Sequence, residues 1–91
     1  MVVMLCRNRV AEFEKWKRVF DSNAPAVRDA GLRLMNLWRD LDESNNVFSL
    51  FEVTDTDKAR ALITNPAAAE SGKRAGVLDG ECHFLESSTD Y

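Results

Sequence analysis

The chain has 91 residues, of which 45% are hydrophobic and 30% charged, and its formal net charge is −3. This length fits one domain, and an acidic domain lacks the clustered Lys and Arg that binding to a nucleic-acid backbone requires. No apolar stretch approaches the ~20 residues of a membrane span, and the apolar start is too short for a secretion signal. We therefore expect a cytoplasmic protein that binds neither nucleic acid nor membrane.

The residue types that usually hold metals and cofactors are scarce. Cys6 and Cys82 are the only cysteines and His83 is the only histidine, so we expect reduced thiols and no zinc site. The sequence carries no phosphate loop, dinucleotide fingerprint or Gly-x-Ser-x-Gly motif. His83 is the only obvious axial ligand for a haem. We expect no cofactor.

The first third of the chain reads as a strand followed by a broken helix. Residues 2–7 alternate with apolar side chains on both faces, which is typical of a strand buried on both sides. A stripe at helical spacing follows, and Pro25 predicts a break near residues 21–23 because it lacks an N–H. Gly31 suits a left-handed helix end. The stripe consists of Val10, Phe13, Trp16, Phe20, Ala24 and Val27.

The middle of the chain reads as a hairpin of two strands, residues 32–39 and 47–53, joined by a polar loop. Strict alternation would place Leu32, Leu34, Asn36 and Trp38 on one face of the first strand. It would place Val47, Ser49, Phe51 and Val53 on one face of the second.

The last third reads as helices followed by a strand. Residues 54–57 have the spacing of a capping box, with Asp in place of Glu, and Ala59, Leu62 and Ile63 follow as an apolar face. Asn65 and Pro66 end that helix and begin another. Gly76 and Gly80 are expected to bracket a turn before a fourth strand at residues 82–86. Residues 1–86 then form the single domain, and residues 87–91 a polar tail.

A strand-helix-strand-strand-helix-strand order predicts the ferredoxin-like α+β fold, with a four-stranded antiparallel sheet. Right-handed crossovers put all the helices on one face of this sheet. The other face carries the second apolar side of the strands, a patch too large to leave exposed. We expect a homodimer formed through this face. Arg7 and Arg33 stand in the strands, and an inward-facing Arg would require a carboxylate.

Several stretches resemble one family. Residues 10–21, 38–47, 50–61 and 75–80, with Phe84-Leu-Glu after them, resemble the dimeric α/β-barrel superfamily, near the small antibiotic-biosynthesis monooxygenases. The resemblance implies a dimeric barrel and a cofactor-independent monooxygenase or cyclase acting on a small aromatic or polyketide-like molecule. It also implies a His where this chain has Asn8, and a Tyr or Trp where it has His83.

His83 is therefore the candidate general base, because its ordinary pKa lies near neutrality and it can abstract a proton from a phenol or enol. The first and last strands of this fold are neighbours, so Asn8 and His83 could lie close together. His83 would then take over the role of the His that the resemblance implies at position 8. The alternative is a partly exposed strand residue without a catalytic role.

The hairpin offers a candidate ligand pocket. If the predicted faces coincide away from the helices, Asn36, Trp38, Ser49 and Phe51 form a mostly apolar wall with a few polar groups. The alternative is that they form the dimer core.

Two functions stay open. One is the cofactor-independent enzyme, and the other is a non-catalytic dimeric ligand-binding or accessory module. A cavity of about 300 Å³ or more with His83 or Asn36 at its wall would favour the enzyme, and a closed interior would favour the module. RNA binding fits the element order, but the third strand lacks the basic residue and the glycines that it uses.

Overall fold

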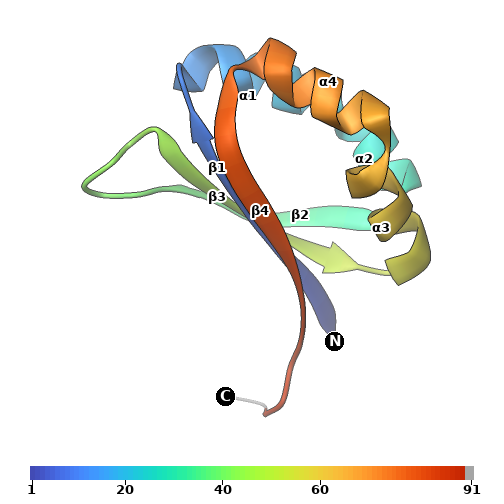
Figure 1. Cartoon of the computed structure of the whole chain (residues 1–91). Coiled ribbons are helices and arrows are strands. Elements are labelled where there is room, and N and C mark those ends of the chain that lie inside the picture. The colour runs from blue at the N-terminus through green and yellow to red at the C-terminus, as the bar shows by residue number, and fades with distance from the viewer. Residues whose placement is uncertain (90–91) are drawn as a thin grey trace.

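A four-stranded antiparallel sheet lies under a layer of helices in the computed structural model, which describes residues 1–89 (Figure 1). The helices cover one face and leave the other open. In chain order the elements are β1 (Val2–Val10), α1 (Phe13–Ser22), α2 (Ala24–Asp29), β2 (Leu32–Arg39), β3 (Asn46–Val53), α3 (Thr56–Thr64), α4 (Pro66–Ala75) and β4 (Val77–Glu86).

The strand order β2-β3-β1-β4 is that of a ferredoxin-like α+β fold, which confirms the predicted class. Each crossover contains two helices, and each break falls where the sequence predicts it. Asn23 separates α1 from α2, just before Pro25. Asn65 ends α3, and its side chain accepts a hydrogen bond from Ala67 N at the start of α4. The prolines thus bend both helical segments over the same sheet face.

The strand register defines two faces, because residues directly opposite each other in neighbouring strands share a face. The face under the helices, here called the inner face, includes the rows Leu34–Phe51–Met4–Phe84 and Leu37–Ser49–Cys6–Cys82. The open face includes the rows Arg33–Glu52–Val3–Leu85, Asn36–Leu50–Leu5–His83 and Trp38–Phe48–Arg7–Glu81. The predicted faces of the first and third strands are confirmed.

The predicted face of the second strand is wrong beyond Leu34. The β2–β3 register shifts between Leu34 and Asn36, so that Leu34 opposes Phe51 and Asn36 opposes Leu50. One residue is inserted at Met35, and such a bulge exchanges the faces of all residues that follow it. Asn36 and Trp38 therefore lie on the open face.

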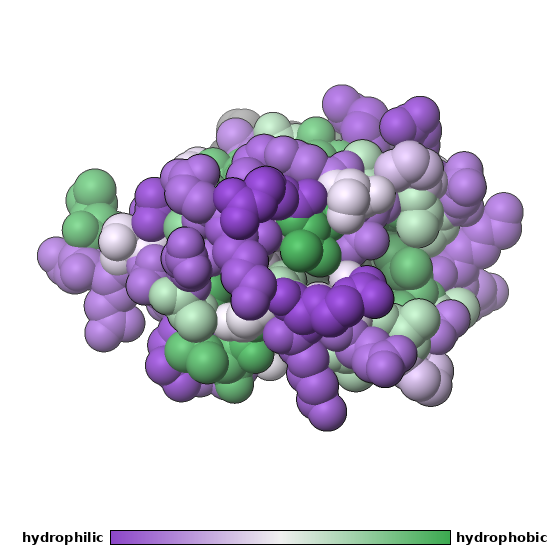
Figure 2. Space-filling model, turned by 90° about the horizontal axis from the view of Figure 1, so that it is seen from above, coloured by the Kyte–Doolittle hydropathy of each residue, from purple (hydrophilic) through white to green (hydrophobic). Residues whose placement is uncertain are grey.

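Hydrophobic packing between the helices and the inner face forms the core. Trp16 of α1 is buried and stacks on Phe20, with ring centroids 4.7 Å apart. Arg39 also reaches the inner face, where its guanidinium carbon lies 3.9 Å from the centroid of the Phe13 ring. The predicted helical stripe supplies the core from Phe13 onward. Its first member, Val10, belongs instead to β1, which continues beyond the predicted end at residue 7. Seen from the helix side, the outer surface is mostly hydrophilic, with small hydrophobic areas between the charged groups (Figure 2).

Three local predictions need correction. The cap of α3 is Asp55 rather than Thr54, because the Asp55 carboxylate accepts the hydrogen bond from Lys58 N. The fourth strand begins at Val77, not at residue 82. Gly76 ends α4 with a φ of 82°, whereas Gly80 lies inside β4, so the predicted turn between the two glycines is wrong. Gly80 is a place of close approach, since a Cβ there would overlap the Arg7 carbonyl oxygen.

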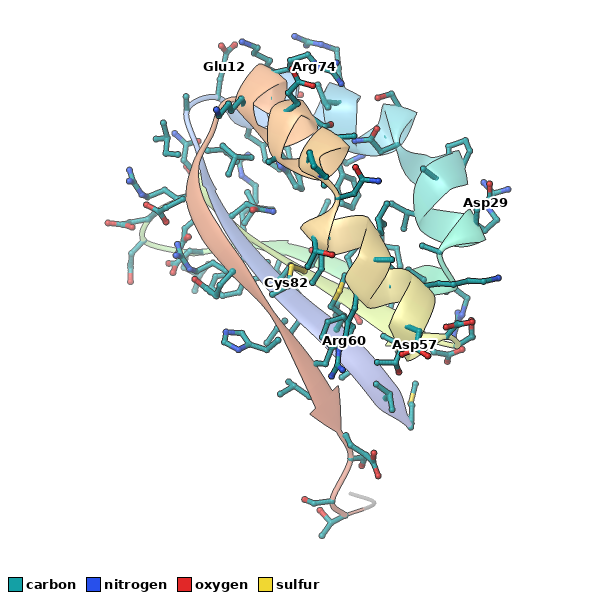
Figure 3. All side chains as sticks on the ribbon, turned by 45° about the vertical axis from the view of Figure 1, so that its right-hand side comes forward. Glu12, Asp29, Asp57, Arg60, Arg74 and Cys82 are labelled. Atoms are coloured by element: carbon teal, nitrogen blue, oxygen red, sulfur yellow. A yellow bond between two sulfur atoms is a disulfide. The ribbon has the colours of Figure 1, made fainter. Side chains whose placement is uncertain are left out.

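Cys6 and Cys82 form a disulfide between the directly opposed positions of β1 and β4 (Figure 3). The prediction of reduced thiols was wrong, because it rested on the expected cytoplasmic location, while the register of β1 and β4 places the two cysteines directly opposite each other. Disulfides persist mainly in oxidising compartments. The disulfide therefore counts against the expected cytoplasmic location, which stays a prediction.

The described part of the chain contains no helix long and apolar enough to cross a membrane. β4 ends at Glu86, and Ser87 N donates a hydrogen bond to Met1 O. The domain boundary at residue 86 stays a prediction, and residues 90–91 of the predicted tail lie outside the described residues.

Candidate ligand-binding site

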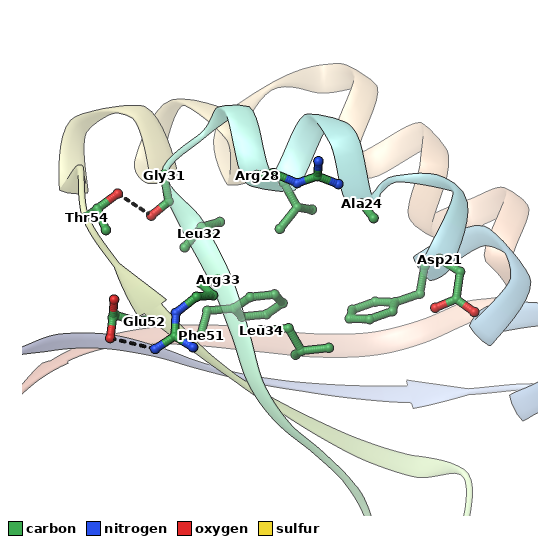
Figure 4. Close-up of a pocket in the computed structure, with 12 residues that line it drawn as sticks. Asp21, Ala24, Arg28, Gly31, Leu32, Arg33, Leu34, Phe51, Glu52 and Thr54 are labelled. Carbon is green, nitrogen blue, oxygen red and sulfur yellow. Dashed lines mark hydrogen bonds and ion pairs between the residues drawn. The ribbon is translucent and has the colours of Figure 1, made fainter.

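A cavity of about 470 Å³ lies between the α1–α2 segment and strands β2 and β3 (Figure 4). Its walls are mainly apolar, and it opens to solvent at a rim of charged side chains. The volume falls in the range of small-molecule sites. The apolar lining residues are Phe20, Ala24, Val27, Leu32, Leu34 and Phe51.

Two phenylalanines from opposite layers form the inner wall. Phe20 comes from the end of α1 and Phe51 from β3, and their ring centroids lie 6.3 Å apart with planes inclined by 43°. Trp16 supports Phe20 from behind, since it stacks on that ring and is almost fully buried. A flat apolar molecule could stack on these aromatic rings, whose positions are fixed by packing in the core.

A tight connection between α2 and β2 closes one end of the cavity. Gly31 has a φ of 76°, and a Cβ there would lie 2.8 Å from Thr54 Oγ1. The Gly31 carbonyl oxygen accepts hydrogen bonds from Thr54 N at 2.8 Å and from Thr54 Oγ1 at 3.0 Å. These bonds tie the beginning of β2 to the end of β3 and keep Leu32 against the helices.

Four charged residues line the cavity: Asp21 and Arg28 from the helices, and Arg33 and Glu52 from strand positions whose side chains belong to the open face. Arg33 Nη2 donates to Glu52 Oε2 at 3.0 Å, and Lys17 Nζ donates to Asp21 at 2.7 Å. Arg28 forms no hydrogen bond or ion pair with any of residues 1–89 through its side chain. The lining contains neither His nor Cys. The cavity can thus bind and orient an apolar molecule, and its two carboxylates are already paired.

Asn8 and His83 are not brought together. Asn8 opposes Gly80 and His83 opposes Leu5, so the two lie about 10 Å apart along the strands. They also face opposite sides of the sheet, with Asn8 on the inner face and His83 on the open face. The expected proximity of the two residues was wrong. His83 has Glu81 as its nearest acidic partner, with Nε2 4.0 Å from Oε2.

The four predicted pocket residues divide between the two faces. Phe51 lines the cavity, and Ser49 lies on the same inner face, where it is buried. Asn36 and Trp38 lie on the open face because of the bulge at Met35. The four side chains therefore do not form one wall.

Sequence reasoning missed the part of the site that the helices contribute. Phe20, Ala24 and Val27 were identified as a buried stripe, but a stripe gives no sign that its last turns stand away from the sheet. The signal was the break before Pro25. The helix α2 begins after this break, and its residues Ala24 and Val27 line the cavity together with Leu34 and Phe51.

The open face carries a polar network at one end. Arg7 donates from Nη2 to Asp79 Oδ1 and to Glu81 Oε1, both at 2.9 Å, and from Nη1 to Asn46 Oδ1. Arg9 adds a hydrogen bond from Nε to Asp79 Oδ2 at 2.7 Å. The hydrogen bond from Arg9 lowers the pKa of Asp79, and that from Arg7 lowers the pKa of Glu81. Arg7 thus has carboxylate partners on the open face, although the sequence analysis required them only for an Arg that faces inward.

No protein-family model matches the chain, and no curated protein matches it. Solved structures do match. SnoaB, a cofactor-independent oxygenase from Streptomyces nogalater, is 19% identical over 98% of this chain and 94% of that one, with a TM-score of 0.75.

Two further structures match over nearly their whole length. A candidate antibiotic biosynthesis monooxygenase from Deinococcus radiodurans is 16% identical over 100% of this chain and 96% of that one, with a TM-score of 0.69. A NIPSNAP domain protein from Burkholderia xenovorans is 16% identical over 97% and 95%, with a TM-score of 0.67. The chain therefore has the ferredoxin-like fold that antibiotic-biosynthesis-monooxygenase-like structures share, as its resemblance to that group predicted.

Proposed function

We propose that the chain binds a small, largely aromatic or polyketide-like molecule in the cavity between α1–α2 and β2–β3. The observation that carries this proposal is a cavity of about 470 Å³ with an apolar lining and two aromatic rings in one wall. Sites for small molecules have this volume and composition, with a few polar groups at the edge that fix orientation.

The test compares two variants that enlarge an exposed helical alanine. Ala24→Leu fills the cavity from α2, and Ala69→Leu makes the same change on α4, outside the cavity. We expect 2-naphthol, titrated by calorimetry, to bind the unaltered protein and A69L equally, and to bind A24L at least ten-fold more weakly. Failure of the unaltered protein to bind, or full binding by A24L, would contradict the proposal.

Cofactor-independent oxygenation is the second candidate. It is favoured by the fold shared with SnoaB, which is described as a cofactor-independent oxygenase. The cavity wall holds neither His83 nor Asn36, and both of its carboxylates are ion-paired. A substrate would therefore have to be acidic enough to ionise without a dedicated side-chain base. Oxygen uptake with 1,3-dihydroxynaphthalene tests this, since A24L should abolish any uptake above that of the protein-free solution.

We also propose that two copies associate through their open faces. The centre of this face is apolar and the helices of the same chain cannot reach it. Its hydrophobic members are Val3, Leu5, Trp38, Phe48, Leu50 and Leu85. Covering such a surface removes apolar area from water, and a second copy offers the same surface around a two-fold axis. In this arrangement His83 and Asn36 belong to the interface rather than to the cavity.

A further inference from the structure

We propose that Arg28 makes the cavity selective for ligands that carry an anionic group, such as a carboxylate, on a flat apolar body. The inference rests on the proposed ligand-binding function and adds the charge of the ligand to it. It follows from the charges at the rim, from the place of Arg28 on α2, and from the apolar surface beneath it.

The four charged residues of the lining sum to zero, but only three of them are engaged in ion pairs. Asp21 is paired with Lys17, and Arg33 with Glu52, so each of these pairs is neutral. Arg28 is the fourth charged residue of the lining, and none of the acidic side chains of residues 1–89 lies within 4.0 Å of it. Within residues 1–89, Arg28 is therefore the one charged residue of this lining that has no contacting partner of opposite charge.

Arg28 is placed where a ligand bound in the cavity would meet it. Ala24 and Arg28 are four residues apart on α2 and share one side of that helix. In Figure 4 the guanidinium lies beside Ala24 on the helix side of the cavity, while Leu34 and Phe51 lie on the sheet side. A molecule lying on Phe51 would thus hold its edge towards Arg28.

The surroundings of Arg28 strengthen an interaction with an anion. The guanidinium can bind a carboxylate through two parallel hydrogen bonds. A ligand that fills the apolar cavity also displaces water from one side of this pair, and the attraction rises as the effective dielectric falls. A neutral ligand gains only the apolar contacts and leaves Arg28 in solvent. The cavity should therefore prefer the acid over the amide of the same ring system.

The test uses 1-naphthoate and 1-naphthamide, which differ only in the charged group, titrated by calorimetry at low salt. We expect the unaltered protein to bind the acid at least ten-fold more tightly than the amide. Arg28→Gln should weaken binding of the acid at least five-fold and leave the amide unchanged, whereas Arg28→Lys keeps most of the preference. Arg18→Gln, on α1 outside the lining, removes the same charge and should change neither affinity.

The outcomes separate this inference from the proposed function. Equal binding of acid and amide to the unaltered protein, or an equal loss in R18Q and R28Q, would overturn the role of Arg28 while the cavity keeps its function. If none of the three probes (1-naphthoate, 1-naphthamide and 2-naphthol) binds, the proposed function fails, and this inference fails with it. A thermal melt of R28Q that matches the unaltered protein ensures that the loss of affinity is not a loss of folding.

Discussion

Arg7 of β1 lies directly opposite Glu81 of β4, and its Nε and Nη2 both donate hydrogen bonds to the Glu81 carboxylate. The same guanidinium reaches Asp79, two residues earlier on β4, at 2.9 Å. These bonds join the central strand β1 to the edge strand β4 on the open face, and the Cys6–Cys82 disulfide joins them on the inner face. The edge strand is thus held from both sides.

The first prediction concerns acid stability. Asp79 and Glu81 both have a lowered pKa in the folded chain, so each carboxylate stabilises the fold above its ordinary pKa. This contribution is lost as the pH falls below about 4 and through the lowered values. We expect the urea midpoint of the unaltered protein to fall between pH 5 and 2 more steeply than that of the double variant D79N/E81Q.

The matched control for this experiment is Glu14→Gln, which removes one carboxylate from the exposed side of α1. It should leave the slope of urea midpoint against pH close to that of the unaltered protein. The same slope in D79N/E81Q as in the unaltered protein would mean that the network on the open face adds no acid-sensitive stability.

The second prediction concerns the disulfide. It closes a loop with a sequence separation of 76, and in the chain-entropy model a loop of this length corresponds to about 4 kcal/mol. We expect a reductant to lower the thermal midpoint by more than ten degrees, since about 1 kcal/mol shifts a domain of this size by 4–8 °C. The Cys6→Ser/Cys82→Ser variant should show the lower midpoint without reductant and not respond to it. An unchanged midpoint on reduction would contradict this prediction.

The fold could be predicted because its signals are local and repeated. Helical spacing from Phe13 to Phe20, the helix breaks at Pro25 and Pro66, and the alternating strands all point to one element order. The β2 face could not be predicted, because residues 32–38 are apolar on both sides. The buried face of a strand can be read from the sequence only where polar and apolar residues alternate. Nothing in this segment marks Met35 as an inserted residue.

The site could be predicted only in part, because it depends on the placement of elements that are distant in the chain. Phe51 follows from the alternation of β3 and is correctly included. Asn8 and His83 were expected to be close because their strands are neighbours, but neighbouring strands do not fix the register, and the register places them apart. The contribution of Arg28 needs the α2–β2 geometry that only the structure provides.

The third prediction compares two glycines. A Cβ at Gly80 would overlap the carbonyl oxygen of Arg7 and approach Asn8 Oδ1 to 2.6 Å. A Cβ at Gly72, inside α4, would meet only Val77, at 3.8 Å. We expect Gly80→Ala to lower the free energy of unfolding by about 2 kcal/mol, as for other changes that force a backbone shift. Gly72→Ala should raise it by about 0.5–1 kcal/mol, because alanine favours a helix.

Urea unfolding of both variants measures their free energies of unfolding. Because the two changes are expected to have opposite signs, each variant serves as the control for the other. A Gly80→Ala variant as stable as the unaltered protein would mean that β1 and β4 do not approach each other as closely at this point as the structure has them.

The last prediction concerns association through the open face. We expect sedimentation at micromolar concentration to give the mass of a dimer for the unaltered protein. Leu50 lies in the middle of the open face, opposite Leu5 and Asn36, so Leu50→Asp would bury one unpaired carboxylate per copy at the interface. An unpaired buried charge costs several kcal/mol, and this should weaken the dimer at least a hundred-fold.

Two further variants separate association from folding. Trp38 is 46% exposed in the single chain, so Trp38→Glu should weaken the dimer with little cost to the subunit. Leu41 is 101% exposed in the loop between β2 and β3, which makes Leu41→Asp a matched change of an exposed apolar residue outside the sheet face. L41D should therefore sediment as the unaltered protein does. A monomeric mass for the unaltered protein at this concentration would refute association through the open face, and the apolar side chains around Leu5 would then require another partner.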